Sequence, residues 1–259
     1  MNYKKIIMIY LMGAMTQMGI VCSIVALLRV NGINYNDFIG VIFLAIAGLS
    51  TAIWGCIASK LSGRVKNYRE IAKVFFKVKE PLKYYAILFI FLIIIFGKQL
   101  LGGEILENVK WYTFLLVFLT AILFGGIEEI GWRYTYQPLL EKYISYELAS
   151  ICTFIAWAIW HYMYFYIVNT LGDISHLAFL LGLLTSCFIL GAIYYITKSL
   201  WLCVLYHVMV NVFSQTLTAP SIVQVYITTF ICIIVSIIFV RNKNRITTVN
   251  ETMNRITNK

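Results

Sequence analysis

Six polar side chains stand at helical spacing in the second half of an otherwise apolar chain. They are Glu128, Glu129, Arg133, His161, His207 and Asn211. Carboxylates and imidazoles can take and return protons, and an imidazole beside an amide can donate hydrogen bonds to a developing oxyanion. No serine, threonine or cysteine is marked by its spacing as a nucleophile, so the set favours hydrolysis by an activated water over an acyl-enzyme.

The elements that position these residues follow from the composition. Of 259 residues, 61% are hydrophobic and 12% are charged, whereas an ordinary soluble domain is nearer half apolar and a quarter charged. The chain is therefore not a soluble globular enzyme, a disordered chain or a nucleic-acid-binding domain. We expect an all-α polytopic membrane protein, in which ionisable groups at membrane depth are costly and usually functional.

About 20 apolar residues cross a bilayer as a helix, and the sequence contains about eight such stretches. They are residues 6–28, 38–59, 84–102, 111–127, 148–169, 177–197, 200–217 and 221–240. Eighteen of the 21 lysines and arginines then fall on one side of the membrane. The three on the other side are Arg29, Lys98 and Lys110. The positive-inside rule places that side, and both termini, in the cytoplasm. The net charge of +10 thus indicates topology, and the basic connector between the second and third spans is expected to lie along anionic lipid.

The paired carboxylates end the fourth expected span. Residues four apart share a helix face, so Glu129 and Arg133 can form an ion pair. Glu128 lies about 100° further around the helix, which directs it to the bundle interior as a candidate general base. A salt-bridge cluster at a helix end would explain the same residues without catalysis.

The two histidines lie within later spans. His161 follows Trp157 by four residues, so both are on one helix face, and His207 and Asn211 share a face in the same way. Read singly, His161 could be a core histidine bonded to a neighbouring helix. The His207 and Asn211 pair could equally hold helices together.

The three motifs in this order resemble those of the CAAX-protease and bacteriocin-processing (CPBP or Abi) family of intramembrane proteases. The matching stretches are Glu128-Glu129-Ile-Gly-Trp-Arg133, Trp157-Ala-Ile-Trp-His161 and His207-Val-Met-Val-Asn211. The second motif of the family usually begins with Phe. Trp157 keeps a large aromatic side chain, and we expect this change to alter the packing only mildly.

The resemblance implies three regions. Residues 1–110 would hold the first spans and the basic connector, 111–217 the protease core, and 218–259 the last span and a basic tail. It also implies an intramembrane endopeptidase in which Glu128 and His161 activate water, His207 and Asn211 stabilise the oxyanion, and Arg133 orients Glu129.

Metal dependence is left open by the residues. Glu128, His161 and His207 match the donor types of a catalytic zinc site, for which the family is often called metalloprotease, but they form no H-E-x-x-H motif and also fit a metal-free mechanism. The six cysteines show no paired spacing, so neither a disulfide framework nor a thiolate site is expected.

The expected substrate is a membrane-associated peptide or protein, met in the bilayer or at its cytoplasmic face, with no nucleic-acid partner. The expected location is the plasma membrane of a bacterium, and the sequence indicates no oligomeric state. Two other functions are compatible with buried Glu and His residues. One is a proton-coupled transporter, and the other is a non-catalytic membrane scaffold or bacteriocin immunity factor.

Overall fold

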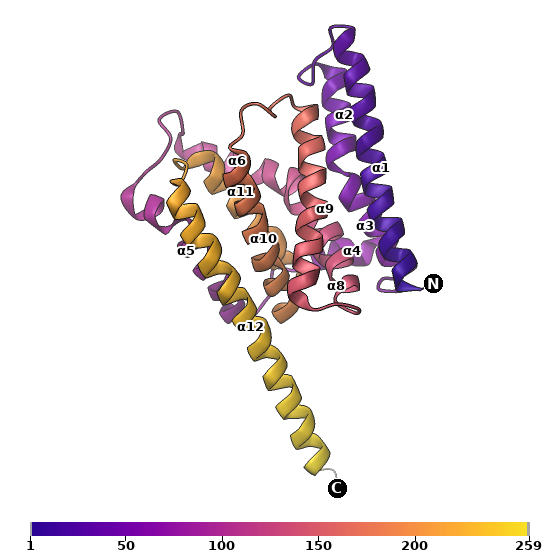
Figure 1. Cartoon of the computed structure of the whole chain (residues 1–259), viewed down its shortest axis with the longest axis vertical. Helices are drawn as coiled ribbons and strands as arrows, with labels where there is room; N and C mark the ends of the chain where they lie inside the picture. The colour runs from indigo at the N-terminus through magenta and orange to yellow at the C-terminus, as the bar shows by residue number, and fades with distance from the viewer. Residues whose placement is uncertain (1, 258–259) are drawn as a thin grey trace.

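The protein is a bundle of helices, as Figure 1 shows for a computed structural model that describes residues 2–257, with side chains to residue 246. The last two residues of the third expected region, 258–259, lie outside the described residues. The longer helices are α1 (Tyr3–Val30), α2 (Phe38–Gly48), α3 (Ser50–Leu61), α4 (Tyr68–Phe75), α5 (Leu82–Gly102), α6 (Trp111–Phe124), α9 (Tyr146–Ile167), α10 (His176–Thr197), α11 (Leu200–Thr216) and α12 (Ile222–Thr257). Residues 2–257 contain no β-strand beyond one isolated bridge between Ile105 and Leu217.

Seven helical segments of the described chain are long and apolar enough to cross a membrane. They are Tyr3–Val30, Phe38–Leu61, Leu82–Gly102, Trp111–Leu140, Tyr146–Ile167, His176–Thr197 and Ile222–Ile246. The remaining expected span, residues 200–217, is α11, a shorter apolar helix of 17 residues that packs against α5, α6 and α10. The expected all-α polytopic fold is confirmed.

The expected end of the fourth span at residue 127 is wrong. The chain stays helical through four short segments to Leu140. These are η1 (Gly126–Glu128, a 3-10 turn), α7 (Glu129–Gly131), η2 (Trp132–Tyr136, a π turn) and α8 (Gln137–Leu140). Glu128 and Glu129 therefore lie inside a helical segment and not at its end. Each has one hydrogen-bond partner on another helix, namely Trp157 of α9 for Glu128 and His207 of α11 for Glu129.

Small residues let this segment enter the bundle. A Cβ atom on Gly55 of α3 would lie 2.7 Å from the Cα atom of Gly131, so the two backbones are in direct contact, as in close helix packing within membranes. In the π turn that follows, the hydroxyl of Thr135 lies 2.8 Å from the carbonyl oxygen of Ile130 and 2.7 Å from the hydroxyl of Ser59. The π turn is thus anchored to α3 by hydrogen bonds.

Capping residues set where the helices that carry the two histidines begin. The Ser145 hydroxyl accepts a bond from the Leu148 amide (3.3 Å) and caps α9. Lys198 ends α10 in the left-handed region (φ 55°), and Ser199 then caps α11 through the Leu202 amide. This tight turn places α10 and α11 side by side, with His207 in the middle of α11.

The two ends of the described chain lie at the same end of the bundle. In Figure 1, α1 starts and α12 ends toward the lower side of the view. This arrangement fits an even number of crossings, with α11 as the eighth. That this end faces the cytoplasm stays a prediction.

Candidate active site

The paired carboxylates are buried side by side in the broken helical segment. Glu128 is 3% exposed, and Glu129 and Arg133 are fully buried. Glu129 Oε2 lies 3.6 Å from Arg133 Nε, so the structure contains the ion pair that the i, i+4 spacing predicts. The guanidinium also lies 4.4 Å from the centre of the Trp157 ring, which gives the buried cation an aromatic face as well as an anion.

Glu129 has a second partner that its spacing could not show. His207 Nδ1 lies 2.7 Å from Glu129 Oε1. A carboxylate on Nδ1 fixes the ring orientation and keeps the proton on that nitrogen. Glu129 thus links Arg133 of its own segment to His207 of α11, and it has no oxygen directed to the cavity described below.

Glu128 points to a different helix. Its Oε2 atom accepts a hydrogen bond from Nε1 of Trp157 on α9, at 2.8 Å. Trp157 is expected to alter the packing only mildly, and the structure adds a hydrogen bond that phenylalanine, which has no N–H group, could not offer this carboxylate. The departure from the family motif was itself the signal that could have identified Trp157.

His161 lies one turn beyond Trp157 on the same helix. Its Nδ1 atom lies 2.9 Å from the backbone carbonyl of Trp157. Because that oxygen can only accept, Nδ1 carries the proton, and in the neutral ring Nε2 is the basic nitrogen. His161 is therefore oriented as a base.

His207 and Asn211 converge on one point beside Gly125. A Cβ atom placed on Gly125 would lie 3.2 Å from His207 Nε2 and 2.3 Å from Asn211 Nδ2. The two side-chain nitrogens therefore lie close together against the backbone of Gly125, which has no side chain to separate them. Two hydrogen-bond donors that face one cavity can together stabilise a developing oxyanion.

Two cavities meet at these residues. The first, of about 430 Å³, is lined by Glu128, His161, His207 and Asn211, together with Thr120 and other side chains of α6, α9, α10 and α11. We call it the carboxylate cavity. The second, of about 530 Å³, lies among α5, α9, α10, α11 and α12, and His161, His207 and Asn211 line it too. Among the described residues no Asp, Glu, Lys or Arg lines it, and we call it the apolar chamber.

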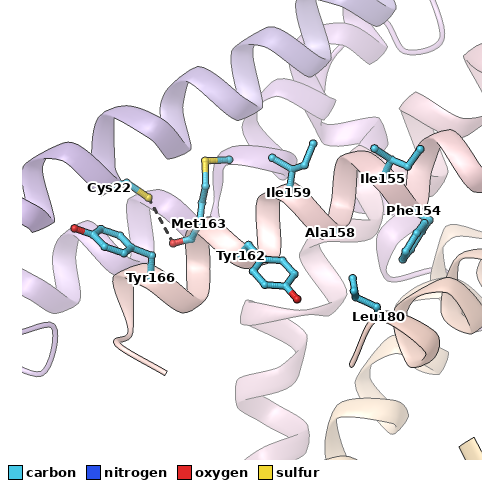
Figure 2. A pocket seen from close by; sticks show the side chains of 9 residues that line it. All are labelled: Cys22, Phe154, Ile155, Ala158, Ile159, Tyr162, Met163, Tyr166 and Leu180. Atoms are coloured by element: carbon cyan, nitrogen blue, oxygen red, sulfur yellow. Dashed lines mark hydrogen bonds between the residues drawn. The ribbon is translucent and has the colours of Figure 1, made fainter. Parts of the chain in front are cut away.

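A third hollow has no part in this chemistry. Figure 2 shows an apolar groove in which Cys22 of α1 lies beside Met163 and Tyr166 of α9, with Leu180 of α10 toward the other end. Its lining contains none of the six predicted site residues. The site is therefore confined to the carboxylate cavity and the apolar chamber.

The candidate zinc ligands do not form a ligand set in this arrangement. Within the described part of the chain, no three His, Cys, Asp or Glu side chains are grouped so that they could hold a metal ion. His207 turns Nδ1 to Glu129, and His161 turns Nδ1 to a carbonyl. In this arrangement the three residues therefore do not fit a metal ion.

The fold and the site define a class of protein, namely an all-α polytopic membrane protein with carboxylates, histidines and an amide gathered inside the bundle. Residues 110–213 match the family model described as type II CAAX prenyl endopeptidase Rce1-like. The matched segment is less than half of the chain but contains all six predicted site residues, so the match supports the resemblance of the three motifs to this family. In general terms, the match supports a CAAX-type intramembrane endopeptidase. Comparison with the curated proteins gives no match.

Proposed function

We propose that the chain hydrolyses peptide bonds of a membrane-associated peptide or protein, using a water that Glu128 and His161 activate. The observation that carries this proposal is that His207 Nε2 and Asn211 Nδ2 lie close together against the backbone of Gly125. Because Glu128 and His161 line the same cavity as these nitrogens, water and a peptide carbonyl can meet there.

The water would lie between Glu128 and the basic Nε2 atom of His161. As the water attacks the carbonyl carbon, its proton passes to Glu128, and the carbonyl oxygen becomes an oxyanion facing His207 and Asn211. Asn211 can donate from its amide in any state, whereas His207 donates through Nε2 only when both ring nitrogens carry protons. Glu129 Oε1, at 2.7 Å from Nδ1, accepts the hydrogen bond that orients the ring. Glu128 then returns the proton to the leaving amine.

Arg133 has an indirect part. It is fully buried and paired with Glu129, so it holds in place the carboxylate that orients His207. Its removal would leave two negative charges on adjacent residues in a dry interior, which is strongly unfavourable.

The two cavities suggest separate paths for the two reactants. Glu128 lines the carboxylate cavity and not the apolar chamber, whereas His161, His207 and Asn211 line both. We propose that water reaches Glu128 through the carboxylate cavity and that an apolar part of the substrate occupies the apolar chamber. The bilayer or its cytoplasmic face, in a bacterial plasma membrane, would be the source of that substrate.

The test is a comparison of peptide termini in membranes and medium of cells that carry the wild-type protein or Glu128→Gln. Glu107→Gln is the matched control, because Glu107 is exposed in the loop before α6. Termini that disappear only in Glu128→Gln would identify both the activity and the substrate. Identical termini in all three strains, with equal protein levels, would refute the proposal and favour a transporter or a scaffold.

A further inference from the structure

Trp157 lies at the centre of the charged groups of the site and is only 2% exposed. Its indole N–H contacts Glu128, and its ring lies 4.4 Å from the Arg133 guanidinium carbon. Its ring centre is 5.2 Å from that of His161 and 5.3 Å from that of His207. One side chain thus contacts all three helical segments that carry the predicted site residues.

The indole group offers Glu128 what the phenylalanine usual at this motif position lacks. A buried carboxylate oxygen without a donor loses its water shell and gains nothing in return. The Trp157 N–H supplies a charge-assisted hydrogen bond to Oε2 at 2.8 Å. Since one oxygen is held in this way, the carboxylate cannot rotate freely, and the other oxygen has a fixed direction.

We propose that the indole N–H of Trp157 is a positioning group that holds Glu128 by Oε2 and leaves its second oxygen to take the proton of the attacking water. This role rests on the proposed function of Glu128. It differs from a packing role because it resides in one N–H group, while the size and aromatic face of the ring serve Arg133 and the two histidines.

The test separates the N–H group from the ring. Trp157→Phe removes the N–H group and part of the ring. Replacement of Trp157 by 3-benzothienylalanine through codon suppression keeps a bicyclic ring of nearly the same size and puts sulfur in place of N–H. Trp54→Phe is the control, because Trp54 Nε1 also donates to a side-chain oxygen on another helix, Gln17 Oε1 at 3.0 Å, away from the site.

We expect both changes at Trp157 to lower kcat by about 10- to 100-fold, the range for a hydrogen bond to a charged group, with KM unchanged. Trp54→Phe should keep wild-type kcat and KM. Wild-type kcat in the benzothienyl protein would overturn the proposal, whether or not Trp157→Phe is impaired, because the ring would then suffice. A rise in KM with unchanged kcat in the benzothienyl protein would also overturn it.

Glu128→Gln is measured in parallel, so that a failure of the proposed role of Trp157 can be distinguished from a failure of the proposed function of the site. If Glu128→Gln is inactive while the benzothienyl protein is fully active, only the role of Trp157 is refuted. If Glu128→Gln itself cleaves at the wild-type rate, the proposed function of the site is refuted with it.

Discussion

Gly125→Ala is expected to abolish most activity while leaving the protein folded. The added Cβ atom would lie 2.3 Å from Asn211 Nδ2, where ordinary contact needs about 3.4 Å, so the amide must retreat by about 1 Å, a shift that is sufficient to disrupt catalysis. His207 Nε2, at 3.2 Å from the same point, is less free to move, because Nδ1 is bonded to Glu129. Asn211 is the end of a flexible side chain and therefore gives way.

The magnitude follows from the loss of one oxyanion donor, which lowers kcat by about 10²- to 10³-fold in enzymes of this kind. Stability should change little, since the group that the Cβ atom displaces most is the end of a flexible side chain. Asn211→Ala alone should show a similar loss of kcat. The double variant Gly125→Ala/Asn211→Ala should have the same kcat as Asn211→Ala, because the Asn211 amide with which the added Cβ atom would clash is then absent.

The assay is the steady-state cleavage, by purified protein in lipid nanodiscs, of a peptide identified from the termini lost in Glu128→Gln. Gly19→Ala is the control for the exchange of a helical glycine, since nothing lies within 4 Å of a Cβ atom at that position in α1. Wild-type kcat in Gly125→Ala would refute the oxyanion geometry. If the loss of kcat in the double variant equalled the product of the two single losses, the added Cβ atom would not act through Asn211.

Four further outcomes are expected. Active protein should contain less than stoichiometric zinc and keep its activity in 1,10-phenanthroline; stoichiometric zinc with a reversible loss of activity would contradict the metal-free mechanism. Glu129→Gln should lower the free energy of unfolding by about 3–5 kcal/mol, because Arg133 keeps a buried charge without its anion, as chemical denaturation would show. Burial raises the pKa of Glu141, between α8 and α9, from 4.5 to about 7. Between these values the folded protein keeps a proton that the unfolded chain loses, so the melting temperature should fall as the pH rises from 5 to 8. The fall should be smaller in Glu141→Gln. Gly182→Phe, which fills open space in the apolar chamber, should raise KM more than it lowers kcat in the same cleavage assay.

The long apolar helices could be predicted from the sequence because their ends are marked locally. The expected span 177–197 agrees with α10, His176–Thr197, because a polar connector precedes the helix and Lys198 follows it. The end of the fourth span could not be predicted. Two adjacent glutamates indicate a helix end when only their own segment is considered, and the donors that keep them inside the bundle are Trp157 and His207.

The site shows the same limit. The ion pair of Glu129 with Arg133 depends on helical spacing within one segment and could be predicted from it. The bond of Glu129 with His207 joins residues that are 78 positions apart, and only the packing of α7 against α11 brings them together. The contact of Trp157 with Glu128 joins α9 to η1 in the same way, so no spacing rule within a helix could have found it.

Two adjacent carboxylates have different partners because a helix turns about 100° between them. Glu128 faces Trp157 on α9, and Glu129 faces His207 on α11 and Arg133 on its own segment. A single carboxylate could not both take a proton from water and hold His207 as an oxyanion donor, since each task uses the oxygens in a different direction. The helical segment formed by η1, α7 and η2 therefore has to lie between α9 and α11. The close contact of Gly55 with Gly131 allows the segment to enter the bundle to that depth. A bulkier residue at either glycine would move both carboxylates together, and it should therefore impair water activation and oxyanion binding in one step.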